Sequence, residues 1–356
     1  MLAGDINFRG RSTRHRLMSV TAIATPQELL VGTTGVTRGM RWLFQANLVA
    51  QIGIVVTGGL VRLTGSGLGC PTWPECVDGS LTPTSAQDES SWHKAIEFGN
   101  RLLTFVLAAL AIAAIVTAIV WWRRRRAAGR YYPRSLLAFA AVPLIGTIVQ
   151  ALLGGVTVLT GLSPYAVAAH FLVSMAIIAG CVVLVVQSAL VQPRGATHQE
   201  PPVRLPRVIR LLAIALLISS AIVVFLGVIV TGSGPHSGDA GVESRFPIDP
   251  RTISWLHADS VWLFLGLIAG ILVALYLVPV PLTLRKRAWL LAGVSVGQGA
   301  VGYIQYFTGV PWPPVALHML GACLVWAITV WLLLGVMRVP SYTNGSIATA
   351  KKSNAR

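Results

Sequence analysis

Charged residues are scarce in this sequence. Asp, Glu, Lys and Arg together make up 11% of its 356 residues, whereas soluble domains carry about 25%. Hydrophobic residues account for 54% of the chain, and the mean hydropathy is +0.70. This composition excludes an ordinary soluble domain and predicts an integral membrane protein.

Acidic residues are fewer than basic ones, with 12 Asp and Glu against 28 Lys and Arg, which gives a net charge of +16. Such an excess can indicate a nucleic-acid partner, but its distribution argues against one. The Lys and Arg residues gather in the two tails and in alternate loops, and this bias predicts cytoplasmic termini and a lipid partner. The exceptions are Arg62, Lys94, Arg101, Arg245 and Arg251.

Residues 1–40 lack a short apolar core followed by a small-residue cleavage site, and they are polar and rich in Arg. We therefore expect no cleavable signal peptide. We expect residues 1–40 and 338–356 to be cytoplasmic tails of a multi-pass protein of the plasma membrane.

Eight segments are apolar over the roughly 20 residues that a membrane-spanning helix needs. The sequence thus predicts an all-α polytopic membrane protein. A linker with four prolines, residues 191–208, divides it into two four-helix halves, 41–190 and 209–337. The expected spans are 41–62, 92–121, 135–159, 166–190, 209–231, 253–279, 289–308 and 314–337.

An internal repeat relates the two halves. Residues 150–170 and 298–318 share seven identities at an offset of 148, and each stretch ends on a histidine, His170 or His318. Because each half has four spans, both halves begin on the same side of the membrane. We expect a parallel repeat of two pseudo-symmetric bundles.

Three histidines lie at similar depth near the outer side of the membrane. His170, His257 and His318 are each about four residues, or roughly 6 Å, inside an expected helix. Ionisable residues at membrane depth are costly and often functional, and two facing imidazoles suit heme iron. His257 and His318 could form such a site, and the alternative is that each histidine is a hydrogen-bonded packing residue.

A carboxylate and two arginines share this outer side. Glu97 lies about five residues into the span 92–121, where it could be a catalytic acid or base. The alternative is a salt bridge, because Lys94 and Arg101 lie on neighbouring helix faces. Arg62 and Arg101 could bind heme propionates, although Arg62 could equally extend to lipid headgroups.

Cysteine is rare, with four residues in the chain. Cys70 and Cys76 lie in the outer loop 63–91, where an oxidising compartment favours a disulfide. The sequence does not distinguish a structural bridge from a redox-active one. Cys181 and Cys323 are expected to be buried as small hydrophobic residues.

The combined motifs resemble the heme A synthase family of cytochrome oxidase assembly. They are Gly-Leu-Gly-Cys-Pro-Thr-Trp-Pro-Glu-Cys in the outer loop, Ile-Glu-Phe-Gly-Asn-Arg in the second span, and the histidines of the fourth, sixth and eighth spans. The resemblance implies oxidation of a methyl group of heme O to the formyl group of heme A. It implies heme b between His257 and His318, substrate heme on His170, an essential Glu97, and a role for Cys70 and Cys76.

One position departs from the family pattern. Asn100 stands where the Glu-x-x-His-Arg motif of that family has histidine, and an amide is a poor iron ligand. Either the substrate heme has His170 as its one protein ligand, with an open or water-occupied position opposite, or His93 supplies the second ligand. We expect the open position.

Family resemblance also implies a partner, the heme O synthase (a farnesyl transferase) that supplies the substrate. The sequence does not indicate the electron acceptor. The main rival is a b-type diheme cytochrome that exchanges electrons with quinone. A transporter built from parallel repeats is disfavoured, because no helix has a clear Gly or Pro break at the midplane.

Overall fold

The computed structural model describes residues 35–84, 90–130, 133–190, 205–237 and 245–339. Expectations for the tails and for most of the linker fall on residues 1–34, 191–204 and 340–356, outside this description. The described residues form eight helices and no β-sheet, which confirms the all-α class. The helices are α2 (Arg38–Leu63), α3 (Ser91–Ala127), α4 (Arg134–Leu159), α5 (Pro164–Leu190), α6 (Arg207–Ser233), α7 (Pro250–Tyr276), α8 (Leu282–Phe307) and α9 (Trp312–Arg338).

Seven of these helices are long and apolar enough to cross a membrane, which confirms a multi-pass membrane protein. The helix outside this group is α8, which contains Gln298, Gln305 and the basic run 285–287. Large apolar side chains are exposed on the outside of the helices, as Phe105 (73%) and Trp262 (62%) illustrate. Such surfaces fit lipid contact, and the eighth crossing stays a prediction.

Most helix ends differ from the expected bounds by one to three residues, and three differences have a clear physical reason. α3 runs to Ala127 and α8 begins at Leu282, because Arg and Lys end a hydropathic pattern yet are good helix formers. α7 ends at Tyr276, three residues before Pro279. A proline restricts the residue before it to extended conformations, which accounts for the early end.

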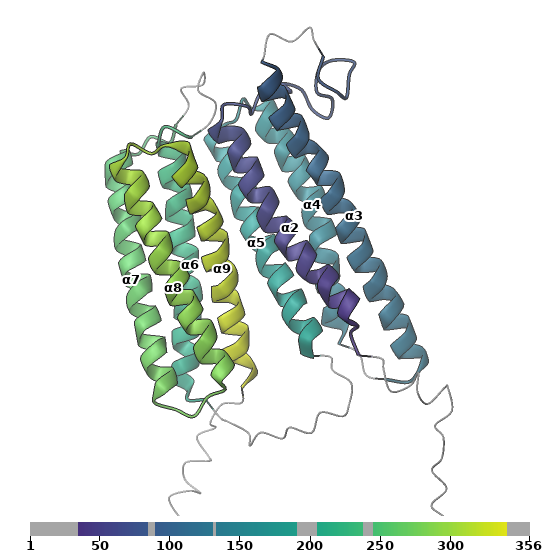
Figure 1. The fold of residues 1–356 in the computed structure, drawn as a ribbon, viewed down its shortest axis with the longest axis vertical. Coiled ribbons are helices and arrows are strands. Elements are labelled where there is room, and N and C mark those ends of the chain that lie inside the picture. Colours follow the sequence, from purple (N-terminus) through teal and green to yellow (C-terminus); the bar gives the residue numbers. More distant parts are fainter. Residues whose placement is uncertain (1–34, 85–89, 131–132, 191–204, 238–244, 340–356) are drawn as a thin grey trace, which may run out of the picture.

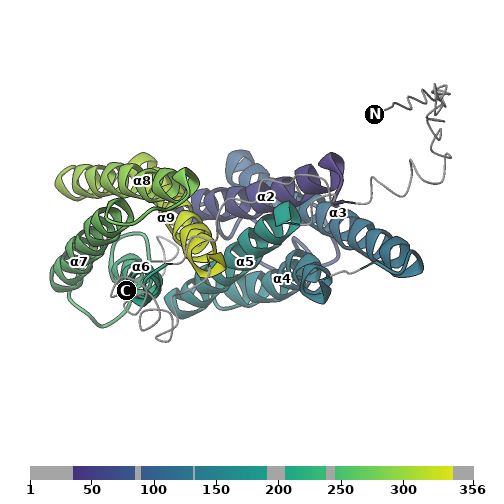
Figure 2. The same ribbon diagram turned by 90° about the horizontal axis from the view of Figure 1, so that it is seen from below.

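The helices stand in two groups, α2–α5 and α6–α9, which lie side by side (Figures 1 and 2). In each group the first helix contacts the second and the fourth helix. Among the described residues, α3 does not contact α5 and α7 does not contact α9, so each of these pairs is diagonal. Helices α2, α5 and α9 share a core at the junction of the groups, which includes Val55, Ile178 and Cys323.

Two outer turns have the same backbone geometry. Leu162, after α4, and Val310, after α8, have positive φ values of 57° and 59°. Their N–H groups donate to Thr157 and Gln305 at 2.8 and 2.7 Å. A preceding glycine in the left-handed region, Gly161 or Gly309, completes each turn, as is common at helix C-termini. The repeat in the sequence therefore corresponds to a repeated turn in the structure.

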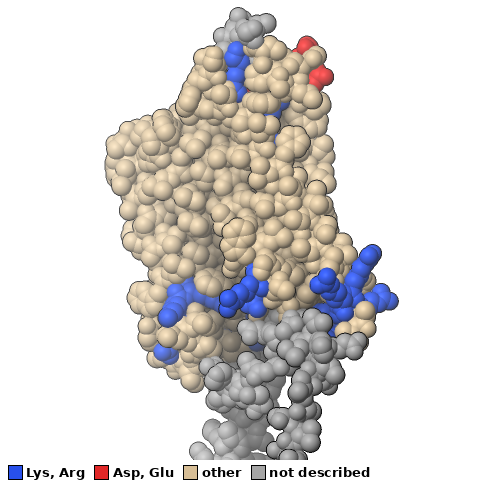
Figure 3. All heavy atoms as spheres, turned by 45° about the vertical axis from the view of Figure 1, so that its right-hand side comes forward, with Lys and Arg blue, Asp and Glu red and all other residues tan. Residues whose placement is uncertain are grey.

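Basic side chains form a band near one end of the molecule (Figure 3). This end contains the end of α3, with Arg123–Arg126, and the start of α8, with Arg285–Arg287. The opposite end contains the outer loop and the histidine-bearing ends of α5, α7 and α9. The candidate site residues therefore lie far from the basic band.

Candidate functional site

His257 of α7 and His318 of α9 face each other across the diagonal of the second group. Their ring centroids lie 6.4 Å apart, and the ring planes cross at 71°. Two imidazoles on opposite sides of one iron, each nitrogen about 2 Å from the metal, have centroids about 6 Å apart. The observed spacing therefore fits a single iron with two axial histidines.

Glycines make room for both rings. A Cβ atom added to Gly227 of α6 would lie 3.2 Å from His257, and one added to Gly302 of α8 would lie 3.1 Å from His318. Both distances are tighter than ordinary van der Waals contact. The neighbouring helices thus approach the imidazoles as closely as glycine permits.

The imidazoles retain unused polar atoms. Nδ1 of His170, His257 and His318 is buried without a hydrogen-bond partner among the described residues. Backbone groups of Val223 and Gln298 lie near the rings of His257 and His318 without completing hydrogen-bond geometry. Leaving such atoms unpaired costs free energy. Iron ligation through one nitrogen, with a carbonyl acceptor for the other, would offset this cost.

His170 of α5 repeats the surroundings of His318. Gln150 donates from Nε2 to the carbonyl of His170 at 2.9 Å, and Gln298 donates to the carbonyl of His318 at 2.7 Å. Gly154 lies beside the His170 ring, where an added Cβ would be 3.5 Å away. The two histidines are therefore held by equivalent contacts in the two groups.

Asn100 of α3 lies on the helix diagonal to α5, as His257 does relative to α9. Its Oδ1 accepts a hydrogen bond from the Thr57 hydroxyl at 2.8 Å. Its Nδ2 lies 3.7 Å from where a Cβ on Gly58 would be. In the first group, the diagonal helices α3 and α5 therefore carry Asn100 and His170, and Thr57 of α2 holds the Asn100 amide. His93 is seven residues earlier, in the first turn of α3.

Glu97 is buried in α3, one helical turn before Arg101. Both of its carboxylate oxygens accept hydrogen bonds. Oε2 accepts from the backbone N–H of Cys70 at 2.8 Å, and Oε1 accepts from Arg101 Nη2 at 2.8 Å. Lys94 donates instead to the carbonyl of Thr84. The ion pair expected for Glu97 is formed with Arg101 at 2.8 Å.

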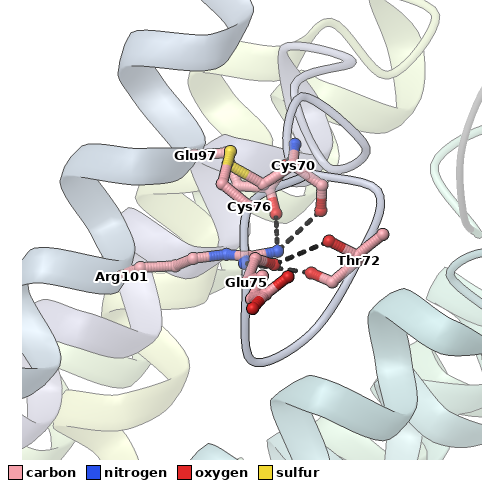
Figure 4. A network of polar contacts seen from close by, with 6 residues as sticks. All are labelled: Cys70, Thr72, Glu75, Cys76, Glu97 and Arg101. Atoms are coloured by element: carbon pink, nitrogen blue, oxygen red, sulfur yellow. Dashed lines mark hydrogen bonds and ion pairs between the residues drawn. A yellow bond between two sulfur atoms is a disulfide. The ribbon is translucent and has the colours of Figure 1, made fainter. Parts of the chain in front are cut away.

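The Arg101 guanidinium is directed at the outer loop (Figure 4). Nη2 also donates to the carbonyl of Cys70 at 2.6 Å, and Nη1 donates to the carbonyls of Thr72 and Glu75, both at 3.1 Å. A disulfide joins Cys70 to Cys76, as expected. Both terminal nitrogens of Arg101 therefore donate to protein groups.

Arg62, near the end of α2, has no ion pair or side-chain hydrogen bond within the described ranges. It lies at the same end of the molecule as the start of the loop 63–91, where the sequence has few other cations. The expectation that the two arginines bind substrate propionates stays a prediction, and Arg62 is the one whose guanidinium has no hydrogen-bond or ion-pair partner among the described residues.

Several site residues escaped the sequence analysis. Thr57, which orients Asn100, was not singled out, and Trp73 belonged to the outer-loop motif without its contact at Gly155 being predicted. Gln150 and Gln298 were identified as the first residues of the repeat. Their hydrogen bonds to the carbonyls of His170 and His318 were not predicted. The shared spacing from Gln150 to His170 and from Gln298 to His318 is the signal that could have revealed it.

The sequence profile of a family described as cytochrome oxidase assembly protein matches residues 40–330. A heme A synthase of Lysinibacillus sphaericus is 33% identical over 194 residues, which cover 54% of this chain and 58% of that protein. One from Geobacillus kaustophilus is 28% identical over 194 residues, 54% of this chain and 56% of that protein.

These matches span little more than half the length of the two relatives. A heme A synthase of Rhizobium etli is similar over a longer range, with 25% identity over 364 aligned positions that cover 88% of this chain and 95% of that protein. Because the family profile covers most of the chain, including every candidate site residue, the chain belongs to the cytochrome oxidase assembly protein family.

Proposed function

We propose that this chain is a heme A synthase, a membrane oxidoreductase that converts the methyl group of heme O to the formyl group of heme A. The observation that carries the proposal is the difference between the two diagonal helix pairs. α7 and α9 present two facing histidines, whereas α3 and α5 present Asn100 and His170 beside a buried Glu97. Membership of the family and the names of its relatives support the same reaction.

In this proposal His257 and His318 hold a resident heme b through their imidazoles. When bound, heme b supplies one-electron redox chemistry, with a potential tuned by its ligands and burial. Gly227 and Gly302 leave room for the rings, and Gln298 fixes the backbone that carries His318. Both residues are half-buried, and the Nδ1 atom of each ring is buried among α6–α9.

The N-terminal group would bind the substrate heme. His170 provides a single histidine ligand, and Arg62 offers a guanidinium to a propionate. Asn100 leaves the opposite face without a strong protein ligand, so we expect an open or water-occupied position there. Glu97 would stabilise charge or accept a proton near the methyl group while its carboxylate is held by Cys70 and Arg101.

The proposal extends to architecture and location. We infer two pseudo-symmetric four-helix bundles, with eight crossings of the plasma membrane and both termini in the cytoplasm. The repeated turns and the repeated glutamine contacts support the symmetry. The basic band supports the orientation. A heme O synthase would supply the substrate.

A b-type diheme cytochrome that exchanges electrons with quinone is less well supported. Such a relay would need two permanently bound hemes, and the N-terminal pair includes an amide where a second histidine would be needed. None of the relatives reported above is named as a quinone-linked cytochrome.

The decisive experiment compares the wild-type chain with Glu97→Ala in cells that lack their own heme A synthase. Extracted hemes are separated by chromatography, and the purified protein is assayed for heme b. We expect heme A to be lost in the variant while protein and heme b remain. A wild-type protein that binds heme b but never yields heme A would contradict the proposal and favour the relay.

A further inference from the structure

The outer loop is attached to α3 through both sides of one residue. Cys70 donates its N–H to Glu97 Oε2 and accepts at its carbonyl from Arg101 Nη2. Glu97 and Arg101 are themselves paired at 2.8 Å, one helical turn apart. One turn of α3 therefore binds the peptide groups on either side of the Cys70 side chain, which enters the disulfide.

Arg101 binds more of the loop than Cys70. Both N–H bonds of Nη1 and both of Nη2 are accounted for by four acceptors, namely the carbonyls of Cys70, Thr72 and Glu75 and the Glu97 carboxylate (Figure 4). Such charge-assisted hydrogen bonds are stronger than neutral ones. The planar fork of arginine suits several fixed acceptors, which a lysine ammonium cannot match.

Close backbone approaches seat the loop on both sides. A Cβ on Gly69 would lie 3.0 Å from the His93 carbonyl oxygen, so the loop lies directly on the first turn of α3. The Trp73 ring lies 2.5 Å from where a Cβ on Gly155 of α4 would be. Gly155 follows Gly154, the neighbour of the His170 ring. The loop thus extends from Glu97 to the helix beside His170.

We propose that Arg101 is a positioning residue that fastens the disulfide loop over Glu97 and the N-terminal site, and not a propionate ligand. The inference rests on the proposed function only where it places substrate beneath the loop. We call the hydrogen bonds of Arg101 and Glu97 to the loop the clamp. The clamp connects the disulfide, Glu97 and Arg101. Loosening the loop would release the hydrogen bond that holds Glu97 Oε2.

Burial of the disulfide provides a direct measure of the clamp. Cys70 and Cys76 are both 0% exposed, so a dithiol can reach the sulfurs only when the loop opens. In this exchange dithiothreitol breaks the bond between the two sulfurs and is itself oxidised to a cyclic disulfide. Its two electrons and two protons leave two thiols on the protein, which alkylation traps for counting by mass.

The experiment measures the reduction rate in the full-length chain reconstituted in lipid. We expect Arg101→Ala to accelerate reduction by about tenfold or more, because the loop loses its charge-assisted hydrogen bonds. Arg62→Ala is the matched control, since it removes a positive charge from the same side, and the Arg62 side chain makes no hydrogen bond with the described residues of the loop. We expect its reduction rate to stay within about twofold of wild type.

A second measurement separates positioning from heme binding. Heme O is titrated spectroscopically into each variant, and its conversion is followed separately. Arg101→Ala should bind heme O like wild type but convert it more slowly, whereas Arg62→Ala should bind it more weakly. Arg101→Lys keeps the positive charge but loses the planar guanidinium, so we expect a partial increase in the reduction rate. This variant replaces Arg101→Ala in the experiment if the alanine variant does not accumulate in cells.

The outcomes distinguish this inference from the proposed function. An unchanged reduction rate in Arg101→Ala, together with weakened heme O binding, would overturn the clamp and restore Arg101 as a heme ligand. If the wild-type chain formed no heme A but Arg101→Ala still opened the loop, the proposed function would fail and the clamp would stand.

Discussion

Gln298 donates a hydrogen bond from its side-chain Nε2 to the backbone carbonyl of His318 at 2.7 Å. The same contact joins Gln150 to His170 at 2.9 Å. In both cases a glutamine of one helix fixes the backbone of a histidine twenty residues later, on the next helix. The two groups therefore place one histidine each by the same means.

Replacement of Gln298 should weaken the cofactor site selectively. Gln298→Leu removes the donor to His318, a loss of about 1 kcal/mol for a neutral hydrogen bond. We expect heme b affinity to fall by about fivefold, measured by competition with a heme-binding apoprotein. Gln150→Leu is the matched control. It should leave heme b affinity unchanged and weaken the substrate site instead, and equal effects of both variants on heme b would contradict the assignment.

Asn100→His should give the N-terminal site a second imidazole. We expect bound substrate heme to change to a six-coordinate low-spin spectrum, because the added imidazole fills the open position. Electron paramagnetic resonance of the purified variant checks the ligand change. The companion variant Thr57→Val removes the 2.8 Å hydrogen bond to Asn100 without adding a ligand, so its spectrum should remain like wild type. An unchanged spectrum in Asn100→His would exclude an open position facing this residue.

The glycines beside the histidine rings should tolerate no larger side chain. Gly302→Val and Gly227→Val place atoms against rings that a bare Cβ already approaches to 3.1 and 3.2 Å. We expect each to lower heme b content by about tenfold, read from the pyridine hemochrome of purified protein. Gly266→Ala, at a helix position with nothing within 4 Å of the added Cβ, should retain full heme b. Normal heme content in both valine variants would disprove the tight fit.

Gly69→Ala should lift the outer loop from α3. Its Cβ would meet backbone atoms of His93 and Lys94 at 3.0 and 3.1 Å, and backbone cannot move aside as a flexible side chain can. We expect faster amide hydrogen exchange across residues 68–80, with little change in α6–α9. The control is Gly53→Ala, which adds the same methyl where nothing lies within 4 Å. Protection equal to wild type in Gly69→Ala would show that the loop does not depend on this contact.

Much of the fold followed from local patterns. Apolar runs predicted the positions of all eight helices to within a few residues, because helix formation in lipid requires a continuous apolar stretch. The exceptions arose at charged residues, as at the start of α8, where hydropathy and helix propensity point in different directions. The bridge between Cys70 and Cys76 was also predictable, since the two residues are close in sequence.

The partners of the site residues were less predictable. Arg101 was a candidate for a propionate, and the structure directs it to Cys70, Thr72 and Glu75. No hydrophobic pattern reports where an irregular loop returns to a helix. The loop position depends instead on close backbone approaches such as that of Gly69 to His93.

The sequence by itself determined that the chain is a bundle of membrane helices with histidines near one end and basic residues near the other. It did so because lipid imposes strict rules on composition and on charge. Only the tertiary structure decided that His257 faces His318 at 6.4 Å and that Thr57 orients Asn100. Those relationships depend on the rotation and spacing of separate helices, which glycine contacts and interhelical hydrogen bonds fix.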